Sequence, residues 1–327
     1  MRRPRQLALT LLVILHPATA PLCSAHEVYI TNEKDNSVSI IDSKTLEVVR
    51  TVKVGKRPRG ITFSKDFKQF YVCASDDNTV QVYDVATEKL LHNLPSGLDP
   101  EQFVLSSDGK RLFIANEDDA VASIVDIEAR RVVKQVDVGV EPEGVALSPD
   151  NKFAVVTSET TNMAHIFDAE SYANVGNVIV DPRPRHTEFS PDGKKIWVSS
   201  EIGGTISVID VATQKVDKTI PFEIQGVGHD AIQPVGFSFT KDGSTVFAAL
   251  GPANRVAVID TATLAVTKYL LVGQRVWHLV LTPEEDLLFT TNGVSNDVTV
   301  IDVKSLKAIK SIKVGRYPWG AAIRPVN

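Results

Sequence analysis

The sequence predicts an all-β protein, a seven-bladed β-propeller of four-stranded blades. Three observations predict it. A motif recurs seven times at nearly constant spacing, each repeat contains four strand-like segments, and the two ends of the chain supply complementary parts of one blade. A fixed period of roughly 20–50 residues is typical of repeat architectures, and four short strands per period indicate a propeller.

The recurring motif is a pair of apolar strand-forming residues followed by aspartate. Successive aspartates are 42 residues apart, except for one step of 50 residues. They are Asp42, Asp84, Asp126, Asp168, Asp210, Asp260 and Asp302. An open solenoid usually carries polar capping repeats at its ends. Since none is evident here, the repeat favours a closed ring.

One repeat illustrates the four strands. Short apolar runs predict strands at Val145–Ser148 and Phe153–Thr157, separated by a Pro-Asp-Asn-Lys turn. Two further strands are predicted at Ala164–Phe167 and Asn177–Val180. The signals are β-branched residues, alternation, and Asp, Gly and Pro between runs. No stretch shows a sustained helical period, so we expect no long helix.

The two ends of the chain predict how the ring closes. Val28–Asn32 resembles the second strand of the repeat, whereas Gly320–Pro325 resembles its first strand. We therefore expect the C-terminal strand to pair beside Tyr29 and complete the N-terminal blade. Such closure removes the exposed sheet edges that an open stack would leave.

The first 25 residues predict a secretory signal peptide. Arg2, Arg3 and Arg5 precede the apolar run Leu7–Leu15, and small residues lead to a cleavage site after Ala25. A lipoprotein cleavage before Cys23 is the alternative. We expect residues 26–327 to form a single propeller domain in the periplasm.

Composition limits the classes of partner. The chain has a net charge of −5 and no basic stripe, which argues against nucleic acid. No apolar run after the signal peptide reaches the length of a membrane helix. We expect a monomer, and we expect Cys73 to be a buried strand residue, since it has no partner for a disulfide once Cys23 is removed.

The repeat resembles the YVTN β-propeller family. The resemblance rests on Tyr29–Asn32, on Asn36–Asp42 and on Pro58–Gly60. Within that family, the Thr-Asn-Glu opening and the Arg-Pro-Arg-His segment at 183–186 are similar to the propellers associated with pyrroloquinoline quinone-dependent catabolism. This resemblance implies a periplasmic accessory protein of an alcohol oxidation system. We expect no bound cofactor, because the sequence has no CxxCH heme motif, phosphate loop or GxGxxG motif.

The loops that precede the first strand of each blade carry the candidate binding residues. Most blades have a proline there, with glycine two residues later. Three blades instead place Gln102, His186 and His278 at the glycine position. A large polar group where the repeat favours glycine is a local conflict of the kind expected at functional sites. Charged and aromatic residues flank the proline position: Arg57, Arg59, Arg183, Arg185, Arg275, Trp277 and Trp319.

A second set of loops on the same face carries glutamates at one repeat position: Glu33, Glu117, Glu159 and Glu201. Two interpretations remain open, structural pairing with neighbouring arginines or a mouth that binds a charged ligand. The extra residues of the 50-residue step fall within 221–230, and we expect them to form a lid that brings His229 toward His186 and His278.

Two functions follow as hypotheses. The first is a non-enzymatic binding protein that captures a small anionic molecule, or docks a periplasmic quinoprotein dehydrogenase or cytochrome, because arginine pairs with carboxylates and tryptophan stacks on flat rings. The alternative is a lactonase-like hydrolase that uses His, Arg and Glu. No metal site is predicted. The predicted ligand-binding residues are Arg57, Arg59, Glu117, Glu159, Arg183, Arg185, His186, Glu201, His229, Arg275, Trp277, His278 and Trp319.

Overall fold

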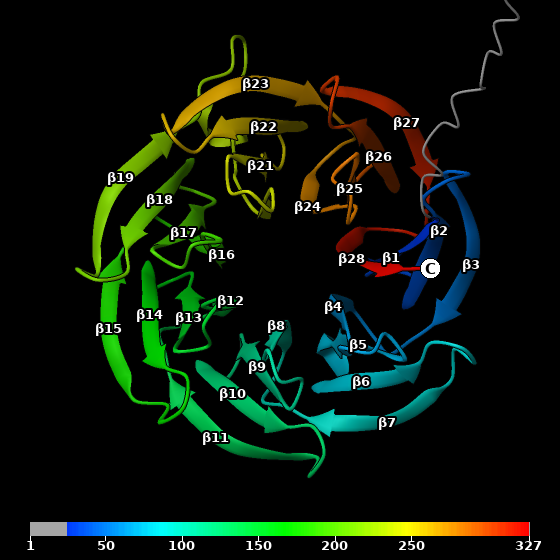
Figure 1. Cartoon of the computed structure of the whole chain (residues 1–327), viewed down its shortest axis with the longest axis vertical. Helices are drawn as coiled ribbons and strands as arrows, with labels where there is room; N and C mark the ends of the chain where they lie inside the picture. The colour runs from blue at the N-terminus through cyan, green and yellow to red at the C-terminus, as the bar shows by residue number, and fades with distance from the viewer. Residues whose placement is uncertain (1–24, 327) are drawn as a thin grey trace, which may run out of the picture.

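A computed structural model describes residues 25–326 of the chain. These residues form seven four-stranded antiparallel sheets arranged as blades around a central axis (Figure 1). The ring confirms the predicted seven-bladed propeller. Of the predicted signal peptide, every residue except Ala25 lies outside the described residues. No helix in the described part of the chain is long and apolar enough to span a membrane.

We number the blades in chain order and give the strands of each from the axis outward. Blade 1 contains β28 (Pro318–Pro325), β1 (His26–Asn32), β2 (Ser37–Asp42) and β3 (Glu47–Lys53). Blade 2 contains β4 (Pro58–Phe63), β5 (Gln69–Ala74), β6 (Thr79–Asp84) and β7 (Leu90–Pro95). Blade 3 contains β8 (Pro100–Leu105), β9 (Arg111–Asn116), β10 (Val121–Asp126) and β11 (Arg131–Asp137).

The remaining blades repeat this order. Blade 4 contains β12 (Pro142–Leu147), β13 (Phe153–Ser158), β14 (Met163–Asp168) and β15 (Asn174–Ile179). Blade 5 contains β16 (Pro184–Phe189), β17 (Lys195–Ser200), β18 (Thr205–Asp210) and β19 (Lys215–Pro221). Blade 6 contains β20 (Phe237–Phe239), β21 (Thr245–Ala249), β22 (Arg255–Asp260) and β23 (Ala265–Leu271). Blade 7 contains β24 (Val276–Leu281), β25 (Leu287–Asn292), β26 (Asp297–Asp302) and β27 (Lys307–Lys313).

Two single-turn 3₁₀ helices, η1 (Ser75–Asp77) and η2 (His229–Ala231), are the other regular elements of the described residues. The four strands predicted for one repeat correspond to β12–β15. The last of them begins earlier than predicted, at Asn174 rather than Asn177, because β15 pairs along almost the whole of β14.

The C-terminal strand closes the ring as predicted. β28 pairs antiparallel with β1, and Ala322 lies opposite Tyr29. The pairing extends from His26, opposite Pro325, to Asn32, opposite Pro318, with one register shift. Blade 1 is therefore assembled from both ends of the chain.

The hydrophobic core lies between the blades. Tyr29 and Val38 of blade 1 pack in one cluster with Phe63 and Phe70 of blade 2, and the rings of Tyr29 and Phe63 meet edge to face at 4.8 Å. Six further clusters of this kind pack the other blades. The outermost strands are largely exposed, as in β19, because only one of their faces meets protein.

The repeated aspartates are turn residues on the face opposite the predicted site. Asp42 accepts hydrogen bonds from the backbone N–H groups of Lys44 and Thr45, at 2.8 and 2.7 Å. Asp210 accepts the corresponding bond from Thr213 at 2.8 Å. An aspartate that bonds the backbone two or three residues ahead fixes a tight turn. The most regular motif of the sequence therefore specifies the fold.

Candidate functional site

Six of the loops that lead into the inner strands share one unusual backbone conformation. The residue before each strand has a positive φ between 49° and 61° although it is not glycine. These residues are Arg57, Asp99, Glu141, Arg183, Arg275 and Tyr317. A non-glycine residue in this region is uncommon and needs support from its surroundings. We call the end of the channel formed by these loops the mouth.

The support comes from an asparagine of the preceding blade. The backbone N–H of Arg183 donates to Asn162 Oδ1 at 3.0 Å, and that of Arg275 donates to Asn254 Oδ1 at 2.8 Å. At three other loops, a backbone N–H donates in the same way to the Oδ1 atom of an asparagine: Asn36, Asn78 and Asn296. These asparagines also have positive φ, which Asn tolerates better than most residues. Three of the five bonds hold the backbone of an arginine of the mouth, and no asparagine was among the predicted site residues.

Three arginines converge on Glu201 in what we call the Glu201 cluster: Arg183, Arg185, Arg275, Glu159 and Glu201. Arg183 Nε lies 2.9 Å from one Glu201 oxygen, and Arg275 Nη2 lies 2.6 Å from the other. Arg185 Nη1 is 3.6 Å from Glu201 and 2.5 Å from Glu159. Arg183 also reaches Glu159 at 2.9 Å. Of the two interpretations left open for the glutamates, structural pairing with arginines therefore holds for Glu159 and Glu201.

The cluster still presents open cationic groups. The Arg183 and Arg275 side chains are 39% and 22% exposed, whereas that of Arg185 is 7% exposed. Each guanidinium has five N–H donors, and the contacts to Glu201, Glu159 and Gln233 use only part of them. Arg183 and Arg275 can thus bind an anionic group while remaining paired with protein carboxylates.

Trp277 gives the cluster an aromatic side. The guanidinium of Arg275 lies 4.2 Å from the Trp277 ring centroid, and that of Arg185 lies 5.7 Å away. Blade 7 has Gly293 at the repeat position where other blades have glutamate, and a Cβ there would collide with the Trp277 indole. The missing glutamate makes room for this ring.

The carboxyl groups of the cluster differ in acidity. Burial raises the pKa of Glu201, but the attraction of Arg185, Arg275 and Arg183 outweighs it, and the pKa falls below the ordinary value. Burial dominates at Glu159, and its pKa is raised. At Glu143, which lies 2.9 Å from Arg185, burial raises the pKa well above the ordinary value. Adjacent carboxyl groups with separated pKa values are the usual basis of acid–base assignments.

A second group of charges occupies the mouth at blades 2 and 3. Arg57 contacts Asp99 and lies 3.2 Å from Glu101, and Arg59 lies 2.8 Å from Glu101. Arg59 also approaches Glu33 at 3.6 Å. Glu101 is fully buried. The charges of this group are paired with one another, although Arg59 Nε has no hydrogen-bond partner among the described residues.

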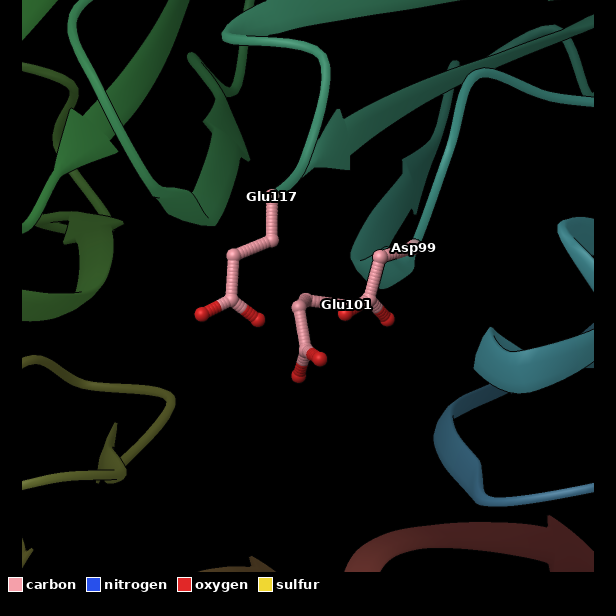
Figure 2. A group of neighbouring side chains, drawn as sticks. All are labelled: Asp99, Glu101 and Glu117. Carbon is pink, nitrogen blue, oxygen red and sulfur yellow. The ribbon is translucent and has the colours of Figure 1, made fainter.

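Figure 2 shows Asp99, Glu101 and Glu117 with their carboxyl groups turned toward one another. One oxygen of each lies within 4.8 Å of the others, so the geometry would admit a metal ion. Burial, together with repulsion by Glu101, raises the pKa of Asp99 to about 6 and that of Glu117 to about 8. Arg57 supplies a cationic partner to this group, through its contacts with Asp99 and Glu101.

The polar residues at the glycine position meet below the mouth. His186 Nδ1 lies 3.3 Å from Gln102 Oε1, and the centroids of the His186 and His278 rings are 5.7 Å apart. Gln102, His186 and His278 come from blades 3, 5 and 7, with glycine-bearing blades between them. Gly236, for example, leaves room for the neighbouring His278 ring, which would approach a Cβ there to 2.5 Å. The three residues are brought together as a group distinct from the charged mouth.

The insertion differs from the predicted lid. It is anchored by Phe222 and Ile232, both 2% exposed, and Figure 1 shows the yellow-green connection after β19 projecting beyond the outer strands. His229 lies against Gly204: a Cβ atom placed on this glycine would be only 2.8 Å from His229 Nε2. The expectation that His229 approaches His186 and His278 is wrong, because Phe222 and Ile232 anchor the loop in the core between blades 5 and 6.

In the described part of the chain, the predicted site residues therefore fall into four spatially separate groups. Arg183, Arg185, Glu159, Glu201, Arg275 and Trp277 meet at one side of the mouth, and Arg57, Arg59 and Glu117 lie at the other. His186, His278 and Trp319 lie below, and His229 lies against Gly204, outside the lining of the cavity that those three share. Two partners were not predicted as site residues. Gln233 accepts a hydrogen bond from Arg275 at 2.6 Å, and Glu143 pairs with Arg185.

Comparison with known families places this arrangement in context. A model of the seven-bladed β-propeller lactonases matches residues 134–309, more than half of the chain. The chain belongs to the seven-bladed lactonase family. A model of the cytochrome d1 heme domain matches residues 67–182. No curated protein matches the chain.

The lactonase match contains the whole Glu201 cluster and excludes Arg57, Arg59 and Glu101. Neither family model names pyrroloquinoline quinone or the YVTN repeat, so that finer resemblance stays a prediction.

Solved structures agree on the fold. A putative 6-phosphogluconolactonase from Bacteroides fragilis is 19% identical, with a TM-score of 0.78, and the match covers 93% of this chain and 99% of that one. Hydrazine synthase from Kuenenia stuttgartiensis is 21% identical, with a TM-score of 0.76 and coverage of 84% and 91%. The dihydro-heme d1 dehydrogenase NirN is 17% identical, with a TM-score of 0.69 and coverage of 90% and 74%. At these identities the likeness concerns the propeller alone.

Proposed function

We propose that this lactonase-family chain hydrolyses a small lactone bearing a carboxylate or phosphate group, and that the Glu201 cluster is its active site. The observation that carries the proposal is the position of Glu201. It is an ionised carboxylate between Arg183 and Arg275, the two partly exposed guanidiniums of the cluster.

Each group of the cluster has a role suited to lactone hydrolysis. Arg183 and Arg275 bind the anionic substituent and polarise the carbonyl, since preorganised donors stabilise the oxyanion that develops there. Trp277 packs against the ring. Water attacks the carbonyl carbon, Glu201 takes its proton, and the ring oxygen leaves and is protonated to a hydroxyl, giving a hydroxy acid. Glu159, whose pKa is raised, is placed to supply that proton.

The balance of charges at the mouth favours binding of a single anionic group over binding of a large polyanion. The described residues of the mouth include five guanidiniums and eight carboxyl groups: Arg57, Arg59, Arg183, Arg185 and Arg275, with Glu33, Asp99, Glu101, Glu117, Glu141, Glu143, Glu159 and Glu201. A large polyanion would meet this excess of acid. A single anionic group between Arg183 and Arg275 would not, because several of the remaining carboxyls have raised pKa values.

A second candidate is ligand capture without turnover. The observation that favours it is that Glu159 and Glu201 are both engaged by arginines, so neither is an unengaged base. In that case the same face would hold a small anion, or contact a heme-containing or quinoprotein partner in the periplasm. Pyrroloquinoline quinone, a polycarboxylate, is one ligand to test.

One assay separates the candidates. The purified chain is incubated with 6-phosphogluconolactone, with 5-oxotetrahydrofuran-2-carboxylate and with uncharged γ-butyrolactone, and acid release is followed by pH-stat titration. Turnover of an anionic lactone above the spontaneous rate, with little for γ-butyrolactone, supports the hydrolase. A rise in Tm with either anionic lactone but no acid release supports capture alone. If neither acid release nor a rise in Tm were observed, both candidate functions would be contradicted.

A further inference from the structure

Below the mouth, the inner strands enclose a cavity of about 240 Å³. Its lining includes Gln102, His186, Glu188, Phe237, His278 and Trp319. We call it the inner chamber. It shares no lining residue with the Glu201 cluster.

Three nearly buried side chains of the inner chamber have polar atoms without a hydrogen-bonding partner in the described protein. They are Nε2 of His278, Nε1 of Trp319 and Nε2 of Gln102. His278 and Gln102 are each 9% exposed, and Trp319 is 1% exposed. Leaving a buried donor unsatisfied costs roughly 1–3 kcal/mol. Three such groups around one cavity indicate a site that a ligand completes.

Side-chain hydroxyls of the second strands tie the backbone of these residues to the next blade. Thr291 Oγ1 accepts the backbone N–H of His278 at 3.0 Å and donates to the carbonyl of Trp319 at 2.7 Å. Ser199 Oγ likewise accepts from His186 N–H at 3.1 Å and donates to Val235 at 2.6 Å. The inner chamber is therefore preorganised before any ligand enters.

The walls are aromatic and uncharged on most sides. The His278 and Trp319 rings are 4.3 Å apart, and the His186 and Phe237 rings meet edge to face at 4.8 Å. Burial, with repulsion by His186, Arg185 and Arg59, lowers the pKa of His278 well below its ordinary value, so the ring is neutral. Glu188, 3.2 Å from His186 Nε2, is 32% exposed and adds the one carboxylate of the lining.

This chemistry defines the ligand class. The indole and amide N–H groups need acceptors, and the carboxylate of Glu188 disfavours an anion. The Arg59 guanidinium lies 5.0 Å from the centroid of the Trp319 ring and is already paired with Glu101 at 2.8 Å. A cavity of roughly 150 Å³ holds a benzene ring, so a chamber of 240 Å³ admits a one-ring molecule. We infer that the inner chamber is a second binding site, separate from the mouth, for a small uncharged ring that carries a carbonyl oxygen.

The test uses cyclohexanone, an uncharged cyclic carbonyl compound that cannot be hydrolysed. The chain labelled with ¹⁵N-tryptophan has three indole N–H signals, from Trp197, Trp277 and Trp319, which are assigned with Trp197→Phe and Trp277→Phe variants. Cyclohexanone should shift the Trp319 signal downfield with a Kd of roughly 1–10 mM, as expected for so small a ligand. Cyclohexene, which lacks the oxygen, and cyclohexanecarboxylate, which is charged, should produce little shift.

Variants separate the inner chamber from the mouth. His278→Phe keeps an aromatic ring and Gln102→Met keeps the length, and each should weaken cyclohexanone binding about tenfold, by loss of one hydrogen bond. Glu201→Gln should leave this titration unchanged whether or not lactones are hydrolysed. No shift of Trp319 at saturating cyclohexanone, or a shift of Trp277 instead, would overturn the inference.

Discussion

At the scale of single residues, the direction of the mouth side chains is set by backbone conformation. Arg183 and Arg275 both adopt positive φ, and both donate their backbone N–H to an asparagine of the preceding blade. That bond stabilises a positive φ, which is an unfavourable backbone conformation for arginine. The guanidiniums are thereby aimed at Glu201 before a ligand is present.

This arrangement makes a testable prediction for Asn162. Replacing Asn162 with Ala removes the acceptor for the Arg183 N–H, which should cost about 1 kcal/mol of stability and lower lactone turnover about tenfold by displacing the guanidinium. Asn296→Ala is the matched control, because it removes the same bond at Tyr317, outside the Glu201 cluster. Thermal melts and kcat/KM should show equal stability losses and unequal activity losses. Equal activity losses would contradict the role of Arg183.

Glu117 predicts a dependence of stability on pH. Burial and the neighbouring Glu101 raise its pKa to about 8 in the folded chain, above the ordinary value of 4.5. A carboxyl with a raised pKa weakens the fold progressively as pH rises from the unfolded to the folded pKa. Glu117→Gln should therefore raise Tm at pH 8 by roughly 2 °C after allowance for solvent screening, and leave Tm unchanged near pH 4.

The measurement is a series of thermal melts of both proteins from pH 4 to pH 9. A constant difference across this range, or a difference that grows toward low pH, would show that Glu117 titrates normally.

The residue patterns of the sequence predicted part of this site. Polar residues at a glycine position identified Gln102, His186 and His278, which meet in the channel as a group. Glycine is favoured there because the inner strands of neighbouring blades nearly touch. A side chain at this position therefore fits only when the adjacent blade has glycine at its own corresponding position. The asparagine anchors escaped notice because asparagine in a loop is common, and its cross-blade bond is visible only in three dimensions.

At the scale of elements, the inner strands and their loops carry the chemistry, whereas the outer strands are polar and exposed. The repeat allowed the strands to be predicted to within a few residues, because each turn has its own aspartate, proline or glycine signal. The insertion between β19 and β20 has no counterpart in the repeat. Its length predicted a loop on the correct face but could not predict that Phe222 and Ile232 would anchor it in the core between blades 5 and 6.

The position of the insertion predicts that His229 takes no part in catalysis or binding. His229→Ala should change lactone kcat/KM by less than about twofold, because the imidazole lies against Gly204 and lines neither the inner chamber nor the Glu201 cluster. Steady-state kinetics with the anionic lactones give the comparison. A loss of tenfold or more would mean that the loop closes over the mouth during turnover.

At the scale of the whole molecule, both ends of the chain complete blade 1. The sequence predicted this closure because its ends match different strands of one repeat, and the β1–β28 pairing bears it out. The protonation and pairing of the charged residues at the mouth could not be predicted from the sequence. Whether a glutamate is paired, ionised or protonated depends on residues from blades that are distant in sequence, such as Arg275 beside Glu201.

Closure predicts that the C-terminal strand is required for folding. A chain that ends at Gly315 lacks β28 and would expose the edge of β1, together with core now covered by Trp319 and Ala322. We expect loss of the near-ultraviolet circular dichroism signal and of cooperative melting, since the ring can no longer close. Cooperative melting near the Tm of the full chain would show that six complete blades and a partial seventh suffice.

The measurement that tests the central claim most directly compares two glutamates at the same repeat position. Glu201 lies between Arg183 and Arg275, whereas Glu33 contacts Arg59 on the other side of the mouth. With an anionic lactone as substrate, Glu201→Gln should lower kcat/KM about a hundredfold, by loss of the general base. Glu33→Gln should lower it less than about threefold. Equal activity in the two variants, with both folded by circular dichroism, would contradict the placement of the active site.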